Sequence, residues 1–177
     1  AAMLLILWWK RGRLRLRDFY PLIPFFVAGI ALGAATGYIE HVHVGASSEK
    51  IAELRLSLQQ RVLIAGRAIA FYAWKLIWPA KLTFIYPRWT VDQNNSFSYI
   101  WLVAGIALCV AIYFARRYVG RSVEVAAAFF VATLSPVLGF IMLYTFRYTF
   151  VADHYQYLAC IGPIALVSAG LVTLTNF

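Results

Sequence analysis

The stretch YIWLVAGIALCVAIYFA, residues 99–115, decides the fold class of this 177-residue chain. It carries no charged side chain, and Arg116 and Arg117 follow it directly. An apolar run of about 17 to 25 residues has the length that a helix needs to cross roughly 30 Å of hydrocarbon. The stretch therefore predicts a membrane-spanning helix that ends in a basic turn.

Apolar runs of similar length recur along the chain, which is 63% hydrophobic and 13% charged, whereas a soluble domain is about half apolar and about one quarter charged. We predict an all-α integral membrane protein, one transmembrane helical domain over residues 1–177. Neither end of the chain looks natural, so we expect a piece of a longer polypeptide. Residues 1–9 are predicted to be the last turns of a truncated span. About four full spans are predicted, at residues 19–39, 99–115, 123–144 and 157–175.

The basic residues predict the orientation of these spans. Of the sixteen Lys and Arg side chains, five lie in residues 10–18 and three in residues 116–121. Basic residues in short loops beside spans mark the cytoplasmic side of a membrane protein. We therefore expect both loops in the cytoplasm, residues 40–98 and 145–156 outside it, and no nucleic-acid partner despite the net charge of +9.

Residues 40–98 form the expected outer loop, which contains interfacial helices. Ser47 and Ser48 are plausible N-caps for a helical region over residues 49–79. This region is long enough to cross the bilayer, but Arg67 at the centre of a span would cost about 2.5–3.5 kcal/mol. A crossing there would also place the two basic loops on opposite sides, so we predict that residues 49–79 lie along the outer interface.

The densest ionisable cluster expected on the outer side consists of Arg147, Asp153, His154 and Tyr157. Charged groups at the mouth of a helical bundle are costly unless they are paired or wetted, and they often mark a substrate path. Arg147 has the geometry to hold a phosphate through bidentate hydrogen bonds. The alternative is an interfacial Arg–Asp pair that only orders the entry to a helix.

Other polar groups give weaker signals. Glu40, His41 and His43 are more readily explained as capping or solvent-facing groups than as metal ligands, because two histidines two residues apart do not share a helical face. The segment FIYPRW, residues 84–89, suits either an interfacial anchor or a sugar platform. No phosphate-binding loop, nucleophile elbow or zinc motif is present, so no cofactor, no metal and no catalytic residue is predicted.

A family resemblance appears at these residues. The segments LILWWKRGRLRLRDFYPLIPFF (5–26), EHVHVG (40–45), GRAIAFYAWKLIWPAKLTFIYPRW (66–89) and FRYTFVADHYQYLA (146–159) together resemble bacterial multi-pass membrane proteins that carry C-terminal tetratricopeptide repeats. That group is similar to the GT-C glycosyltransferases, including the transmembrane and tetratricopeptide-repeat O-mannosyltransferases. The last segment is the most specific, although His154 stands where the pattern more often has Arg.

The resemblance implies a protein of the bacterial inner membrane that transfers a sugar from a polyprenyl-phosphate donor on the extracytoplasmic side. It implies that Arg147, Asp153, His154 and Tyr157 contact the substrate, and that the catalytic carboxylate lies upstream of Ala1. Whether this chain is itself an enzyme stays open. The alternative is a non-catalytic accessory subunit of a larger membrane complex that binds lipid, pigment or protein. Expected partners are membrane lipids, the lipid-linked sugar and other membrane subunits.

Overall fold

The computed structural model describes residues 2–43, 56–140 and 144–175, which form helices joined by irregular segments, with no strand among them. The predicted all-helical class is therefore confirmed for the described part of the chain. The α-helices are α1 (Ala2–Arg11), α2 (Ile23–His43), α4 (Leu58–Ile77), α5 (Ile100–Val119), α6 (Ser122–Leu134) and α7 (Ile161–Thr175). Short 3-10 turns are η1 (Leu16–Asp18), η2 (Tyr20–Leu22), η3 (Ser96–Tyr99), η4 (Ser135–Val137), η5 (Tyr144–Arg147) and η6 (Asp153–Gln156).

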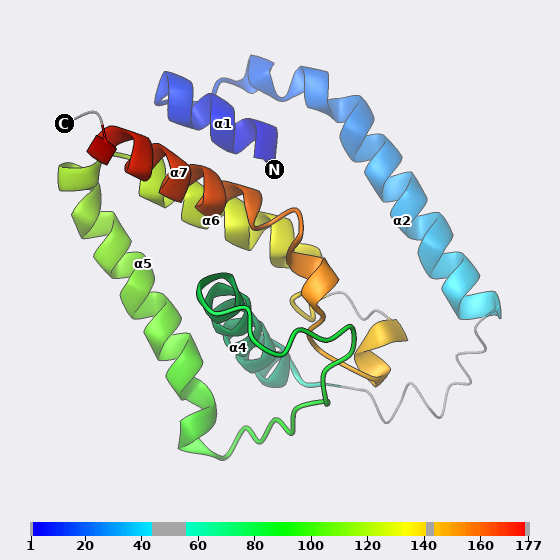
Figure 1. The fold of residues 1–177 in the computed structure, drawn as a ribbon. Helices are drawn as coiled ribbons and strands as arrows, with labels where there is room; N and C mark the ends of the chain where they lie inside the picture. Colours follow the sequence, from blue (N-terminus) through cyan, green and yellow to red (C-terminus); the bar gives the residue numbers. More distant parts are fainter. Residues whose placement is uncertain (1, 44–55, 141–143, 176–177) are drawn as a thin grey trace.

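The helices form one packed group with a single outlying arm (Figure 1). Helix α6 packs against both α1 and α7, and α5 packs against α4 and α6. Helix α4 appears foreshortened in this view, so it crosses the direction of α5 rather than running beside it. Helix α2 extends away from the group, and its Gly29 and Gly33 have no neighbouring atom within 4 Å of the position of an added Cβ.

Two segments in the described part are long and apolar enough to cross a membrane, Leu16–Thr36 and Ser96–Val119. The first corresponds to the predicted span 19–39, although α2 begins only at Ile23 because the chain takes 3-10 turns around Pro21. The second corresponds to the predicted span 99–115. Helices α6 and α7 have 13 and 15 residues. At about 1.5 Å per residue they reach only about 20 and 22 Å.

The predicted third span over residues 123–144 is wrong in its second half. Helix α6 ends at Leu134, a 3-10 turn follows at Ser135–Val137, and residues 138–140 are not helical. Pro136 offers no N–H for the helix, and its ring crowds the preceding turn. Gly139 then adopts a positive φ of 95°, which reverses the chain and lets Leu138 pack into the core.

Helix α4 begins at a capping box rather than continuing a helix from residue 49. The Ser57 hydroxyl accepts a hydrogen bond from the Gln60 N–H at 3.2 Å, and the Gln60 side chain accepts one from the Ser57 N–H at 2.9 Å. This reciprocal pair satisfies the free N–H groups of a helix start. The backbone of Ser57 is extended, so the continuous helix predicted over residues 49–79 is broken here. The expected caps Ser47 and Ser48 lie outside the described residues.

The core forms where α4, the end of α6 and residues 146–159 meet. Tyr72 of α4 and Leu134 of α6 are fully buried, together with Phe146 and Ala159. We expect residues 145–156 on the outer side of the membrane, and within the protein Phe146 and residues 149–152 are buried. Their apolar side chains fill the space between α4 and α6. The segment is therefore an irregular inner layer of the core.

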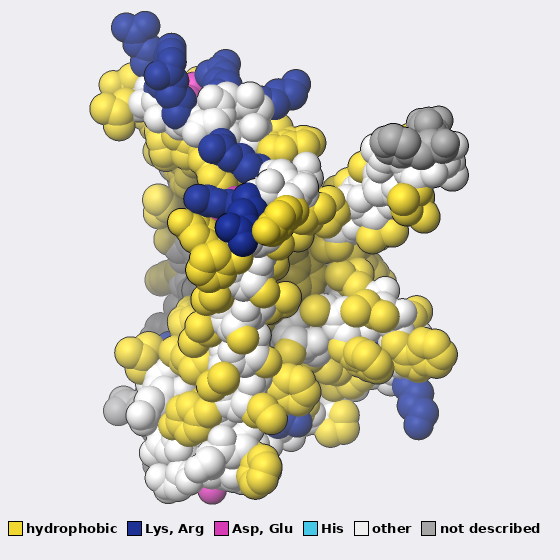
Figure 2. Space-filling view, turned by 90° about the vertical axis from the view of Figure 1, so that its left-hand side faces the viewer, with side chains coloured by type: hydrophobic (Ala, Val, Ile, Leu, Met, Phe, Trp, Pro, Cys, Tyr) yellow, Lys and Arg dark blue, Asp and Glu magenta, His cyan; other side chains and the backbone are white. Residues whose placement is uncertain are grey.

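The two basic loops lie at one end of the molecule. The Arg121 guanidinium lies 5.7 Å from the Trp8 ring, and its Nη1 is 3.1 Å from the position of a Cβ on Gly12. The space-filling view shows Lys and Arg side chains gathered at this end (Figure 2). The chain thus brings residues 10–18 beside residues 116–121, as expected if both loops face the same compartment.

Candidate functional site

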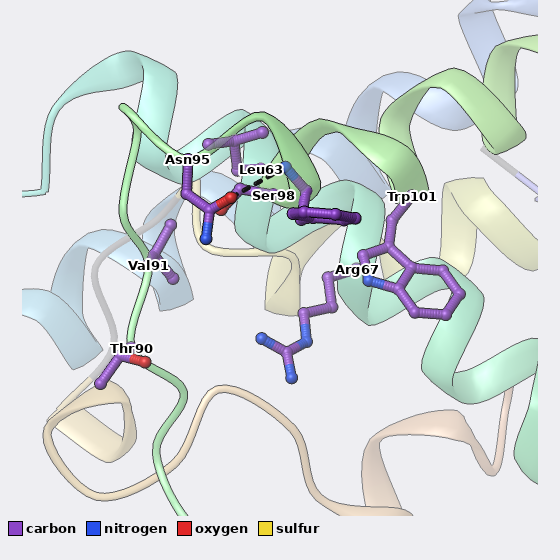
Figure 3. Close-up of a pocket in the computed structure, with 8 residues that line it drawn as sticks. Leu63, Arg67, Thr90, Val91, Asn95, Ser98 and Trp101 are labelled. Atoms are coloured by element: carbon purple, nitrogen blue, oxygen red, sulfur yellow. Dashed lines mark hydrogen bonds between the residues drawn. The ribbon is translucent and has the colours of Figure 1, made fainter.

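A pocket of about 250 Å³ lies between α4, the loop that follows Trp89, and the start of α5. Arg67 extends into it from α4, with Trp101 beside it and the loop residues Thr90, Val91 and Asn95 on the other side (Figure 3). The full lining consists of Leu63, Arg67, Thr90, Val91, Asn95, Phe97, Ser98 and Trp101. One positive charge is therefore set among aromatic and neutral polar groups.

Arg67 has no anionic partner within the described part of the chain. Its guanidinium lies 4.3 Å from the centre of the Trp89 ring. Among the described residues it makes no hydrogen bond and no ion pair. Burial lowers the pKa of the Arg67 guanidinium, which still remains protonated at physiological pH. A partly desolvated cation that lacks a counter-charge is stabilised when an anion enters the pocket.

Neutral donors stand near this cation. The Asn95 Oδ1 accepts a hydrogen bond from the Phe97 N–H at 3.0 Å, which leaves the Asn95 Nδ2 group available. Neither Asn95 Nδ2 nor the Thr90 hydroxyl has a hydrogen-bond partner in the residues that the structure describes. A planar guanidinium with free amide and hydroxyl donors is a suitable arrangement for phosphate oxygens.

The pocket lies at the opposite end of α5 from the basic loops. Close packing of α4 on α5 places it there, because an added Cβ on Gly66 would lie 3.4 Å from the Leu102 backbone. Helix α5 has 20 residues, and at about 1.5 Å per residue it is about 30 Å long. That length equals the thickness of a typical hydrocarbon core, roughly 30 Å.

Asp153, one of the predicted site residues, is engaged by the loop that follows α4. Its carboxylate accepts a hydrogen bond from the Thr83 N–H at 2.6 Å. The Tyr86 hydroxyl lies 3.0 Å from both carboxylate oxygens. Asp153 therefore ties residues 81–86 to the start of η6, and it does not line the Arg67 pocket.

The other predicted site residues are not all brought together. The His154 ring stacks on Phe84 with 4.5 Å between ring centres, and its Nδ1 is buried without a hydrogen-bond partner in the described residues. The Tyr157 side chain is 71% exposed and lies away from this contact. The backbone of Arg147 belongs to η5, but its side chain lies outside the part that the structure describes.

The side chains of Glu40, His41 and His43, at the end of α2, also lie outside the described part. Among the residues whose side chains are described, no group of three or more His, Cys, Asp or Glu could hold a metal ion.

Two polar residues of α4 serve the fold rather than the pocket. The Tyr72 hydroxyl lies 3.0 Å from the Ala152 N–H nitrogen and 3.3 Å from the Ala152 carbonyl oxygen, so it bridges both groups. Desolvation by burial raises the pKa of Tyr72 well above its usual range. The Lys75 ammonium donates to the carbonyl groups of Ala80 and Lys81, which folds the chain back over the end of α4.

Sequence reasoning named Arg67 only as a cost for a membrane crossing and did not single it out as a candidate for anion binding. The signal was present, because an Arg inside an otherwise apolar helix often marks a functional position. Trp89 and Tyr86, in the predicted anchor or sugar platform, instead pack around Phe71 at ring distances of 5.8 and 4.9 Å. They are half-buried supports of the core.

The chain matches no model of a known protein family, no curated protein and no solved structure.

Proposed function

We propose that this chain is a multi-pass protein of the bacterial inner membrane, the membrane half of a GT-C-like glycosyltransferase. It takes its sugar from a polyprenyl-phosphate donor on the extracytoplasmic side. The two basic loops face the cytoplasm, and α4 lies along the opposite interface. Four membrane segments, α2, α5 and the shorter α6 and α7, make up the bundle, and α6 packs against α7.

The single observation that carries this proposal is the Arg67 pocket. It offers a guanidinium without an anionic partner among the described residues, and free donors from Asn95 and Thr90 surround it. Trp101 and Phe97 supply apolar walls, as a phosphate attached to a hydrocarbon chain requires. The pocket lies one helix length, about 30 Å, from the basic loops, which is the depth of the outer headgroups.

In this proposal the pocket binds and orients the donor, and it performs no bond-breaking itself. No carboxylate is among the described residues that line it, so this pocket does not supply a catalytic carboxylate. Arg67 holds the phosphate, and Arg147 assists it as the resemblance implies.

The test is binding of polyprenyl phosphate to the purified chain in nanodiscs, with a polyprenol of equal length as the ligand without phosphate. We expect binding that depends on the phosphate. Arg67→Gln should weaken it about tenfold to hundredfold, because a charge-assisted hydrogen bond contributes about 1.5–3 kcal/mol. Arg67→Lys should retain part of the affinity, since it keeps the charge but loses the planar fork.

Arg88→Gln is the matched control. Arg88 is an exposed arginine whose guanidinium lies 5.0 Å from the Phe150 ring, outside the pocket. Arg88→Gln removes one positive charge, as Arg67→Gln does, and should leave the binding of polyprenyl phosphate unchanged. Equal binding of polyprenyl phosphate and polyprenol would instead support the accessory-subunit alternative, in which the bundle binds lipid, pigment or protein without using the phosphate.

A further inference from the structure

The end of the molecule opposite the Arg67 pocket contains a second hollow. It has a volume of about 380 Å³ and is lined by Arg11, Arg13 and Arg15. Helix α1 ends just before it, where Gly12 adopts a positive φ of 70° and its N–H bonds to the Trp8 carbonyl at 2.8 Å. This turn places three arginine residues around one space.

The charge of this hollow is only partly compensated within the described residues. Asp18 accepts a hydrogen bond from Arg11 at 2.7 Å and another from the Arg15 backbone N–H at 2.9 Å. It therefore fixes the loop and engages one guanidinium. The side chains of Arg13 and Arg15 make no hydrogen bond or ion pair in the part that the structure describes.

Neighbouring elements add to the positive field. Arg121 lies against Gly12 from the other basic loop, and Arg116 and Arg117 end α5 close by in sequence. The guanidinium groups of Arg116 and Arg117 lie over the rings of Tyr113 and Tyr118, at 4.0 and 4.8 Å. Lys and Arg side chains dominate this end of the surface in Figure 2.

We propose that this hollow binds the headgroup of an anionic phospholipid that carries two phosphates, as cardiolipin does. Two free guanidinium forks suit two phosphate groups, since each fork can hold one phosphate through paired hydrogen bonds. The flanking Leu14 and Leu16 are 41% and 82% exposed, so they are available to the acyl chains at the membrane surface. A basic pocket beside transmembrane helices on the cytoplasmic side is a suitable place for such a headgroup.

General attraction between a basic face and an anionic membrane is the rival explanation, and matched variants separate the two. The purified chain in detergent is titrated with cardiolipin, phosphatidylglycerol, phosphatidylcholine or inorganic pyrophosphate, and bound species are counted by native mass spectrometry. We expect one tightly held cardiolipin per chain. The double variant Arg13→Gln/Arg15→Gln should lower its affinity about tenfold or more, since it removes both forks.

The control Arg116→Gln/Arg117→Gln removes the same two charges from the same face and should change the affinity less than about twofold, because these groups do not line the hollow. The affinity of Arg13→Lys/Arg15→Lys for cardiolipin should fall between the affinities of these two glutamine variants. This variant keeps the test valid if Arg13→Gln/Arg15→Gln folds poorly. Equal losses in both glutamine variants, or pyrophosphate binding as tightly as cardiolipin, would overturn the proposal. So would an absence of bound cardiolipin in the unchanged chain.

This inference does not depend on donor binding at the other end of the molecule. Arg67→Gln should leave cardiolipin binding unchanged, and Arg13→Gln/Arg15→Gln should leave polyprenyl phosphate binding unchanged. The two proposals can therefore fail separately.

Discussion

The Tyr72 hydroxyl joins two segments that are 80 residues apart in the chain. Tyr72→Phe removes the bridge and leaves the buried Ala152 N–H and carbonyl without their partner. We expect the free energy of unfolding to fall by about 1–3 kcal/mol. Thermal unfolding of the purified protein measures this loss. Tyr157→Phe, at a tyrosine that is 71% exposed, should change the midpoint little, and an equal change in both variants would contradict the bridge.

The same hydroxyl predicts a dependence on alkaline pH. Burial raises the pKa of Tyr72 in the folded protein, whereas an unfolded tyrosine ionises near pH 10. Because the pKa is higher in the folded than in the unfolded protein, the contribution of the Tyr72 hydroxyl to stability is fully present below about pH 10 and is lost as the pH rises further. The stability difference between the unchanged protein and Tyr72→Phe should therefore narrow above about pH 10. A constant difference up to pH 11 would contradict the assignment.

Substitution of Asp153 distinguishes a structural role of this residue from a role in substrate binding. Asp153→Asn removes the charge that accepts hydrogen bonds from Thr83 and Tyr86, so we expect a loss of about 1–2 kcal/mol in stability. Polyprenyl phosphate binding by the folded variant should stay unchanged. The loss should be smaller in a Tyr86→Phe background, because the two side chains share one interaction. Weaker donor binding in well-folded Asp153→Asn protein would indicate that Asp153 contributes to the substrate site.

The limits of sequence reasoning are clear at these residues. Asp153 was singled out as a substrate contact or a partner of Arg147, whereas its partner Tyr86 lies 67 residues away and no local pattern connects them. Arg67 likewise gains its pocket from Asn95 and Trp101, which only the fold brings near. Side-chain chemistry can be predicted from local sequence, whereas the partner of each group depends on tertiary contacts.

One glycine in the contact between α6 and α7 leaves no room for a larger side chain. A Cβ on Gly162 would lie 3.0 Å from Phe129 Cδ1 and 3.2 Å from the Ala126 carbonyl oxygen. Because the carbonyl belongs to the backbone of α6, Gly162→Ala must move one helix from the other. We expect a loss of about 1–3 kcal/mol in stability, the usual cost of overpacking.

Gly170, in the same helix, is the matched control. An added Cβ there meets no described atom within 4 Å, so Gly170→Ala should be neutral or should gain up to about 1 kcal/mol from helix propensity. Thermal unfolding of both variants tests the pair. If Gly170→Ala destabilises the protein as much as Gly162→Ala, close packing at Gly162 is not the cause.

At the scale of elements, local composition predicts helices better than it predicts their ends. The span predicted at residues 99–115 appears as α5 because its uninterrupted apolar run contains no competing signal. The span predicted over residues 123–144 contains Pro136, and α6 ends just before it, at Leu134. Leu138 then packs into the core with residues of α4, and that contact cannot be read from the proline alone.

The arrangement of the whole chain predicts which positions a membrane-impermeant thiol reagent can reach. In a background with Cys109 and Cys160 replaced by Ala, Asn94→Cys in intact cells should be labelled from outside. Leu16→Cys and Tyr118→Cys, at side chains that are 82% and 79% exposed, should be labelled only after the membrane is opened. These two positions report the two basic loops. Labelling of Tyr118→Cys in intact cells would reverse the proposed orientation.

At the scale of the molecule, charge distribution predicted that the two basic loops would share one end, and Arg121 beside Trp8 and Gly12 agrees with this. The burial of residues 149–152 was not predictable in the same way. Residues 145–156 as a whole read as a polar and aromatic loop, and only the space between α4 and α6 turns residues 149–152 into part of the core. Composition can place a loop relative to the spans, but it does not tell whether that loop is covered.

This inner layer also determines when the protein can finish folding. Tyr72 and Ala68 belong to the same core cluster as Val151 and Ala159, which are synthesised about 80 residues later. At usual rates of synthesis this delay is about 4–16 s. Until then the apolar face of α4 lacks these two partners, although α5 and α6 have already been made and pack on other parts of it. A chain stalled near residue 140 should therefore be cut by protease within α4, whereas the finished chain should resist cleavage there. Packing of this core is thus completed only when residues 151–159 reach a helix that was made much earlier.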